Sequence, residues 1–202
     1  MTRISSQEFL AQDFRVHGLL ADVPLHDVWS LDLPGFSKGI TLREFRARTR
    51  KADTLGKLSW PTRILFRLRF VIGQILRLET EPRGSRQLYF ANRLTAEDRA
   101  VSLVPPGTSD GGFRVVYCLE NEILLEALNR TVHGALMSAL QQTAAGYRFY
   151  IAIYVRKVNW ITPAYMALID PFRRWIVYPA IVREIRRSWT EQFGPSNLKH
   201  LN

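Results

Sequence analysis

The sequence of 202 residues contains a single cysteine, Cys118. One cysteine excludes an intrachain disulfide and a cysteine-based zinc site, and it makes a reducing compartment the default expectation. The longest apolar runs, such as 175–182, hold about eight residues, whereas a membrane-spanning helix needs roughly 20. Residues 1–14 lack the continuous apolar stretch of a secretory signal. We therefore expect a cytoplasmic protein that is soluble or peripherally attached to a membrane.

Motifs for metal binding, phosphate binding and nucleophilic catalysis are also missing. The four histidines form no HxxxH, HxH or HExxH pattern, and no GxSxG elbow occurs. The glycine-bearing segment 107–112 has no lysine and is therefore not a phosphate loop. We expect no metal and no cofactor, and we assign no catalytic residue.

Charge is unevenly distributed along the chain. The sequence holds 28 basic and 18 acidic side chains, a net charge of +10, and residues 43–77 alone contribute ten basic and two acidic ones. The net charge of this segment is +8, so most of the positive charge belongs to one surface rather than to the whole molecule. No nucleic-acid recognition motif accompanies this charge, so nucleic acid is not a favoured partner.

The basic third is predicted to contain a helix that begins at Ser59, where the hydroxyl can cap it and Pro61 suits the first turn. One arc of this helix is apolar and faces the core. The opposite arc mixes aromatic and basic side chains, which fits an anionic membrane or an acidic partner and, as a less favoured alternative, stacking on nucleobases. If a second element covers the aromatic pair, the arc is instead structural. The predicted membrane or partner surface consists of Arg63, Phe66, Arg67, Phe70 and Arg77.

The order of predicted elements indicates an α+β fold. A strand over 27–33 is followed by two shorter helices, the first capped by Thr41. Loop signals at 83–85 and 104–112 bracket a segment with room for one or two short strands. The strongest strand candidates are 113–119, 123–128, 131–142 and 148–158. We expect a curved antiparallel sheet wrapped around one long C-terminal helix.

The long helix is predicted from Pro163 to about Gln192. Beyond Pro179 its apolar face rotates by more than about 100°, and a kink at this proline would keep both halves packed. Before Pro179 the predicted core-facing stripe is Tyr165, Leu168, Ile169, Phe172, Trp175 and Ile176, and after it Tyr178, Val182, Ile185 and Trp189.

Five strings resemble a bacterial family known as a domain of unknown function. They are 92–95 (NRLT), 102–108 (SLVPPGT), 113–117 (FRVVY), 129–133 (NRTVH) and 165–174 (YMALIDPFRR). The family is similar to the START-like, or SRPBCC, helix-grip superfamily, whose members have one strand, two short helices, six strands and a long helix. The resemblance implies one domain over 21–193, with an N-terminal extension at 1–20 and a loose tail at 194–202.

The resemblance also implies an internal cavity that binds a small hydrophobic or amphipathic ligand, of lipid or polyketide type. The resemblance identifies no catalytic residue in this chain. The residues expected to line the cavity are Tyr117, Met137, Phe149, Ile151, Ile153, Tyr165, Ile169, Phe172 and Ile176.

Two arginines, Arg130 and Arg173, are candidates for the cavity rim or for contact with an anionic head group. Asp170 has two interpretations. It holds an arginine near the cavity mouth and orients a ligand, or it pairs with Arg174 at i,i+4, an exposed helix pair worth about 0.3 to 0.5 kcal/mol.

Two further functions compete with ligand binding. One is a cyclase- or aromatase-like enzyme that uses the same cavity, for which Tyr117, His133 and Tyr150 are the weak candidates. The other is a membrane or protein-interaction module that acts through the basic surface. Of the remaining histidines, His17, His26 and His200 are expected to be solvated.

Overall fold

The computed structural model describes residues 1–35, 39–51, 87–110, 112–129, 132–160 and 162–193, with the backbone alone at 48–51, 164–165 and 168–169. Its centre is an antiparallel sheet of seven strands in the order β1-β2-β7-β6-β5-β4-β3. The strands are β1 Thr2–Arg3, β2 Leu25–Pro34, β3 Ser109–Asp110, β4 Phe113–Cys118, β5 Glu122–Leu128, β6 Val132–Thr143 and β7 Gly146–Lys157. The α+β class, the antiparallel sheet and the five predicted strands are thus confirmed.

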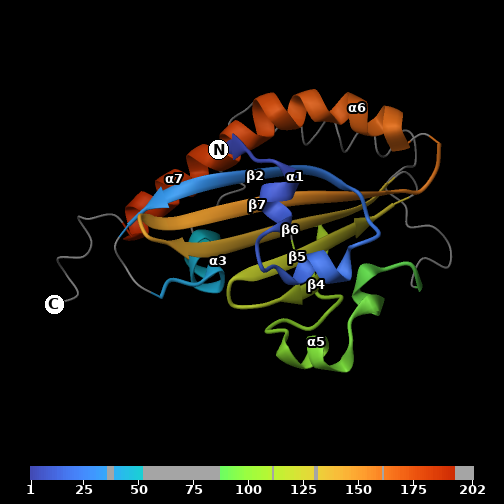
Figure 1. The fold of residues 1–202 in the computed structure, drawn as a ribbon, viewed down its shortest axis with the longest axis horizontal. Coiled ribbons are helices and arrows are strands. Elements are labelled where there is room, and N and C mark those ends of the chain that lie inside the picture. The colour runs from blue at the N-terminus through green and yellow to red at the C-terminus, as the bar shows by residue number, and fades with distance from the viewer. Residues whose placement is uncertain (36–38, 52–86, 111, 130–131, 161, 194–202) are drawn as a thin grey trace.

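Helical elements lie on both sides of the sheet. They are α1 Ser6–Leu10, α2 Arg15–Leu19, α3 Leu42–Lys51, the 3-10 helix η2 Phe90–Arg93, α5 Ala96–Val101, α6 Thr162–Phe172, the π-helix η3 Arg173–Val177 and α7 Tyr178–Phe193. Figure 1 shows α6 and α7 along the β2 edge of the sheet and α5 beyond the opposite edge.

Alternation along the strands produces a buried core on each face of the sheet. On one face, which we call the N-terminal face, Phe9 and Val16 from the first helices and Phe90 from η2 cover Met137 and Tyr150. On the other, the helix face, Phe45 of α3 and Trp189 of α7 join Phe149, Ile151 and Leu125. The face of β7 that carries Tyr150 and Tyr154 is therefore buried, because α1 and α2 pack on it.

The predicted cap of the first helix is confirmed. The backbone N–H of Glu44 donates to Thr41 Oγ1 at 3.1 Å, and the backbone N–H of Thr41 donates to Glu44 Oε2 at 3.3 Å. These bonds satisfy N–H groups that the first turn leaves unpaired. The second predicted helix, from Ser59, lies outside the described residues.

Residues 87–101 correct the expectation of short strands. They form η2 and α5 instead. Thr95 and Asp98 make a reciprocal capping box at the start of α5, with distances of 3.1 Å and 3.0 Å between side chains and backbone N–H groups. The Thr-x-x-Asp spacing is a helix-start signal that favours this outcome.

The C-terminal helix changes character directly before Pro179. The backbone N–H of Tyr178 donates to the carbonyl of Arg173, five residues earlier, within the π-helical segment. Proline lacks an N–H and its ring displaces the carbonyl four residues back, so the wider π turn accommodates it. Beyond this point the predicted stripe is correct for Tyr178, Ile185 and Trp189, which are buried.

Gly146 is required where β7 begins. Its φ is 141°, and a Cβ placed there would lie 2.5 Å from the carbonyl oxygen of Leu33. We expect Gly146→Ala to lower the free energy of unfolding by roughly 3 kcal/mol. The added Cβ disfavours this backbone angle and would collide with the Leu33 carbonyl. Urea denaturation measures this value.

Gly107→Ala is the matched control. Gly107 also has a positive φ, 88°, but a Cβ there meets no atom within 4 Å. Its cost should be about 1 kcal/mol. Equal costs for the two variants would contradict the role of the Leu33 contact.

Candidate functional site

A bulge in β2 turns two consecutive polar residues toward the C-terminal helix. Leu25 pairs with Tyr154 and Asp27 with Ile153, so His26 is the extra residue. In a regular strand His26 and Asp27 would point to opposite faces, whereas a bulge can redirect one of them. Both reach the helix: His26 Nε2 lies 2.9 Å from Asp170 Oδ2, and Asp27 contacts Arg173.

Arg173, the first residue of η3, joins the strand to the helix. Its Nη1 donates to Asp170 Oδ1 at 2.8 Å, and its Nη2 lies 3.4 Å from Asp27 Oδ2. The guanidinium also donates to the Tyr178 hydroxyl oxygen, and that hydroxyl donates to Asp27 Oδ2 at 3.1 Å. We call His26, Asp27, Asp170, Arg173 and Tyr178 the Asp27 cluster.

The Asp27 cluster is largely buried and nearly balanced in charge. Only 2% of the Asp27 side chain and 12% of the Arg173 side chain are exposed. Arg3 Nε approaches Asp27 Oδ1 at 3.5 Å, so two guanidinium groups face two carboxylates. Burial raises the pKa of Tyr178 to about 12, which keeps its hydroxyl protonated at neutral pH. The cluster therefore supplies fixed hydrogen-bond donors and acceptors.

One donor beside this cluster has no acceptor among the described residues. The ring of Trp29 packs on that of Tyr178 with centroids 5.1 Å apart, and its Nε1–H is buried without a hydrogen bond. A buried donor left unpaired costs about 1 to 3 kcal/mol. A bound oxygen at this point would satisfy it.

Next to the cluster, the helix face of the sheet is only partly covered. Ile153 pairs with Asp27 on one side and with Leu136 on the other, so the three side chains lie in one row across the sheet. Ile153 and Leu136 are half-buried, and so are Gly134 and Ser138 on the same face of β6. We call Gly134, Leu136, Ser138 and Ile153 the apolar strip. The described helix residues in the core of this face come from α3 and α7, not from α6 or η3.

The predicted cavity residues of the sheet divide between its two faces. Phe149 and Ile151 are buried on the helix face, with Ile153 in the strip. Tyr117 and Met137 belong to the core of the N-terminal face. A bulge between Val115 and Tyr117 reverses the alternation of β4, and Met137 pairs with Ala152 of that same face. Tyr117 and Met137 therefore cannot line one cavity with Ile153.

The residues of the long helix that were predicted to face the core differ in their exposure. Phe172 and Trp175 were expected to face the core, but 38% and 80% of them are exposed. Arg173, the first residue of η3, points inward to Asp27 in their place. Ile176 is half-buried, and the side chains of Tyr165 and Ile169 lie outside the described structure.

Arg173 is also the partner of Asp170. The expected i,i+4 pair with Arg174 is absent from the ion pairs of the described residues, and Asp170 pairs with Arg173 at i,i+3. Arg130, the other rim candidate, lies outside the described residues. So does the predicted basic surface of Arg63, Phe66, Arg67, Phe70 and Arg77.

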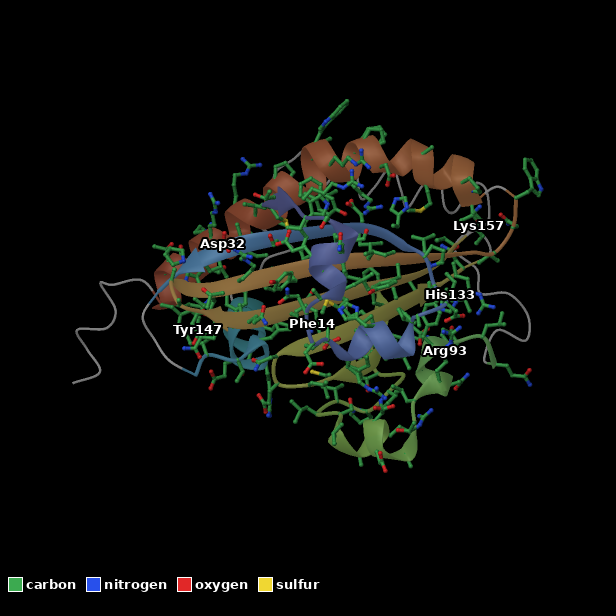
Figure 2. All side chains as sticks on the ribbon, in the orientation of Figure 1. Phe14, Asp32, Arg93, His133, Tyr147 and Lys157 are labelled. Atoms are coloured by element: carbon green, nitrogen blue, oxygen red, sulfur yellow. The ribbon has the colours of Figure 1, made fainter. Side chains whose placement is uncertain are left out.

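The titratable candidates for catalysis lie on the N-terminal face, and each has a partner. The Tyr117 hydroxyl donates to Glu122, His133 Nε2 lies 3.0 Å from Glu126 Oε2, and the Tyr150 hydroxyl donates to Gln141 at 3.2 Å. The ring of His133 also stacks on Phe90, with centroids 3.7 Å apart. Figure 2 shows His133 and Arg93 together at one end of the sheet.

Sequence reasoning missed two buried glutamates of β5. Glu122 accepts the backbone N–H groups of Arg15 at 2.8 Å and Val16 at 3.0 Å, at the start of α2. Glu126 accepts those of Phe90 at 2.7 Å and Ala91 at 3.1 Å, at the start of η2. Two acids four residues apart in an otherwise apolar strand share one face, and that spacing was the available signal.

Two expectations for histidine need correction. His26 is half-buried and paired with Asp170 rather than solvated. His17 packs edge-on against Phe9, with ring centroids 4.9 Å apart, and both its ring nitrogens are buried without a hydrogen bond to the described residues. His17 is half-buried, and its ring nitrogens are shielded because the N-terminal helices pack on the sheet. His200 lies outside the described residues.

Comparison with known proteins identifies a family. The family described as "Protein of unknown function (DUF2867)" matches residues 19–180, which include the whole Asp27 cluster and the apolar strip. No curated protein and no solved structure matches the chain. Among the described residues, no three His, Cys, Asp or Glu side chains are grouped to hold a metal ion, and no helix is long and apolar enough to cross a membrane.

Glu126 anchors η2, and its removal should be costly. Glu126→Leu leaves two backbone N–H groups and His133 without their acceptor, so we expect unfolding free energy to fall by about 3 to 5 kcal/mol. Glu126→Gln keeps an oxygen acceptor and should lose clearly less. Urea denaturation of both variants would reject the anchoring role if the two losses were equal.

Glu122 gives a stability difference that depends on pH. Burial raises its pKa above the ordinary value of 4.5, so between 4.5 and the raised pKa the folded state binds more protons than the unfolded state. Its stabilising contribution is therefore complete below pH 4.5 and is lost as the pH rises. Relative to Glu122→Gln, the wild-type protein should lose stability between pH 4.5 and 7.5. Urea midpoints of both proteins at the two pH values measure this change. A wild-type protein that gains stability relative to the variant as the pH rises would contradict a raised pKa of Glu122.

Proposed function

The chain belongs to the DUF2867 family, and we propose that it binds a small hydrophobic or amphipathic ligand, of lipid or polyketide type, under the first half of its C-terminal helix. The proposal includes the helix-grip arrangement of the START-like superfamily, in a bacterial cytoplasmic protein. It is supported by the order of the elements, with the long helix after the last strand of an antiparallel sheet.

The observation that carries the proposal is a polar end beside an apolar floor. The unpaired Nε1–H of Trp29 lies next to Tyr178 of the Asp27 cluster, and the half-buried Ile153 and Leu136 extend across the sheet from Asp27. Ligand sites are mostly apolar with a few placed polar groups. The apolar part of the ligand would cover the strip, and an oxygen of its head group would accept from Trp29.

The cyclase or aromatase alternative has no comparable support among the described residues. It needs a titratable group that faces the site without a structural partner. Tyr117, His133 and Tyr150 each have a partner and lie on the opposite face of the sheet. Binding without chemistry is therefore the function we propose.

Leu136→Trp should block the site by filling the apolar strip. We expect its affinity for the fluorescent amphipathic anion 1-anilinonaphthalene-8-sulfonate to be at least about tenfold lower than that of the wild-type protein. Leu103→Trp, at an exposed position outside the strip, is the control and should bind as the wild type does. Circular dichroism confirms that each variant is folded.

Native mass spectrometry of the protein purified from its own host supplies the second measurement. The wild-type protein should carry a bound mass that Leu136→Trp lacks. Trp29→Phe keeps an aromatic ring but removes the N–H, so the same bound molecule should be held about fivefold more weakly. Absence of a bound mass from the wild type, together with equal probe binding by all variants, would contradict the proposal.

A further inference from the structure

The outer face of η3 carries an exposed aromatic surface. Trp175 is 80% exposed, and Phe172, three residues earlier, is 38% exposed. Pro179, four residues after Trp175, is exposed on the same side. Single exposed apolar residues need no explanation, but a tryptophan that stands out beside a phenylalanine and a proline forms a contiguous patch.

Basic side chains continue this outer face. Arg174 is exposed beside Trp175, and Arg183 and Arg186 follow at helical spacing after Pro179. None of the three makes an ion pair with a described acidic residue. Residues 171–183 contain no Asp or Glu, and the acids that follow, Glu184 and Glu191, both lie within 4 Å of Arg187.

We infer that this surface, Phe172, Arg174, Trp175, Pro179, Arg183 and Arg186, docks onto an anionic lipid bilayer. Tryptophan suits the boundary between head groups and acyl chains, because its ring is apolar and its N–H is polar. The guanidinium groups of Arg174, Arg183 and Arg186 would attract the anionic head groups at this same boundary.

Charge also decides between a bilayer and a second copy of this chain. A two-fold pairing through this face would bring the same arginines close together, on a chain whose net charge is already +10. An anionic membrane carries the opposite charge and would attract this surface. The proposed occupant is therefore the lipid surface.

The docking surface and the proposed ligand site share one segment. Arg173 of η3 points inward to Asp27, whereas Arg174 and Trp175 point outward. Docking would thus place the helix beside the apolar strip at the bilayer, where an amphipathic ligand resides. This use of the surface as an entry route rests on the proposed function, but the docking itself does not.

Vesicle sedimentation tests the docking. The wild-type protein should bind vesicles of phosphatidylcholine with about 30% phosphatidylserine, should not bind pure phosphatidylcholine, and should be released by salt. Trp175→Ser should bind about tenfold more weakly, because the buried indole area is lost. Arg174→Gln should bind about fivefold more weakly, since one attracted charge is lost.

Matched controls lie at a distance from this face. Val101→Ser removes an exposed apolar side chain from α5, which lies beyond the opposite edge of the sheet in Figure 1. Arg43→Gln lowers the net charge by the same amount as Arg174→Gln, at an exposed site on α3. Both controls should bind the anionic vesicles as the wild type does.

Leu136→Trp separates this inference from the proposed function. Because its apolar strip is filled but its outer face is unchanged, it should still bind anionic vesicles while it fails to bind the fluorescent probe. Failure of all proteins to bind the probe would contradict ligand binding and leave the docking result intact.

Three outcomes would overturn the docking inference. The first is equal binding of neutral and anionic vesicles, or of neither. The second is unchanged binding by Trp175→Ser when a Phe66→Ser, Phe70→Ser double variant has lost it. The third is a wild-type dimer, by light scattering, that Trp175→Ser converts to a monomer, since the occupant would then be a second copy.

Discussion

Two glutamate carboxylates on β5 anchor the layer that covers the N-terminal face of the sheet. Glu122 and Glu126 each accept two consecutive backbone N–H groups, one pair from the start of α2 and the other from the start of η2. Those N–H groups would otherwise be buried without acceptors. Because the carboxylates are fixed four residues apart on one strand, they also fix the spacing of the two elements they hold.

Coverage of the N-terminal face determines where a site can form. Phe9, Val16 and Phe90 pack against this face, so in the described structure it forms a closed hydrophobic core. On the helix face, the α7 half of the long helix is packed on the sheet through Ile185 and Trp189. The α6 and η3 half contacts β2 through Arg173 and Asp27, and Ile153 and Leu136 beside this contact are half-buried. Among the described residues, the apolar strip is the part of the helix face that is only half-buried next to the Asp27 cluster.

Three local irregularities set which residues meet. The bulge at His26 turns consecutive residues of β2 toward one helix, and the bulge before Tyr117 turns that side chain away from it. Within the π-helical turn before Pro179, Arg173 lies inward and Trp175 lies outside. Each adds or displaces about one residue, which is enough to move a side chain to the opposite face of a strand or to the far side of a helix.

The sequence by itself determined the class of fold, the five main strands, the cap at Thr41, the disturbance at Pro179 and the buried half of the helix beyond it. These follow from local signals, namely alternation, capping side chains and proline chemistry, that act within a few residues. Only the tertiary structure decided that Arg173 and not Arg174 pairs with Asp170, that Tyr117 and Met137 lie away from Ile153, and that the ring nitrogens of His17 are buried. Those outcomes depend on register, on bulges and on what packs over each face. Arg173, for example, contacts Asp27, 146 positions away, and periodicity within one segment cannot report such a contact.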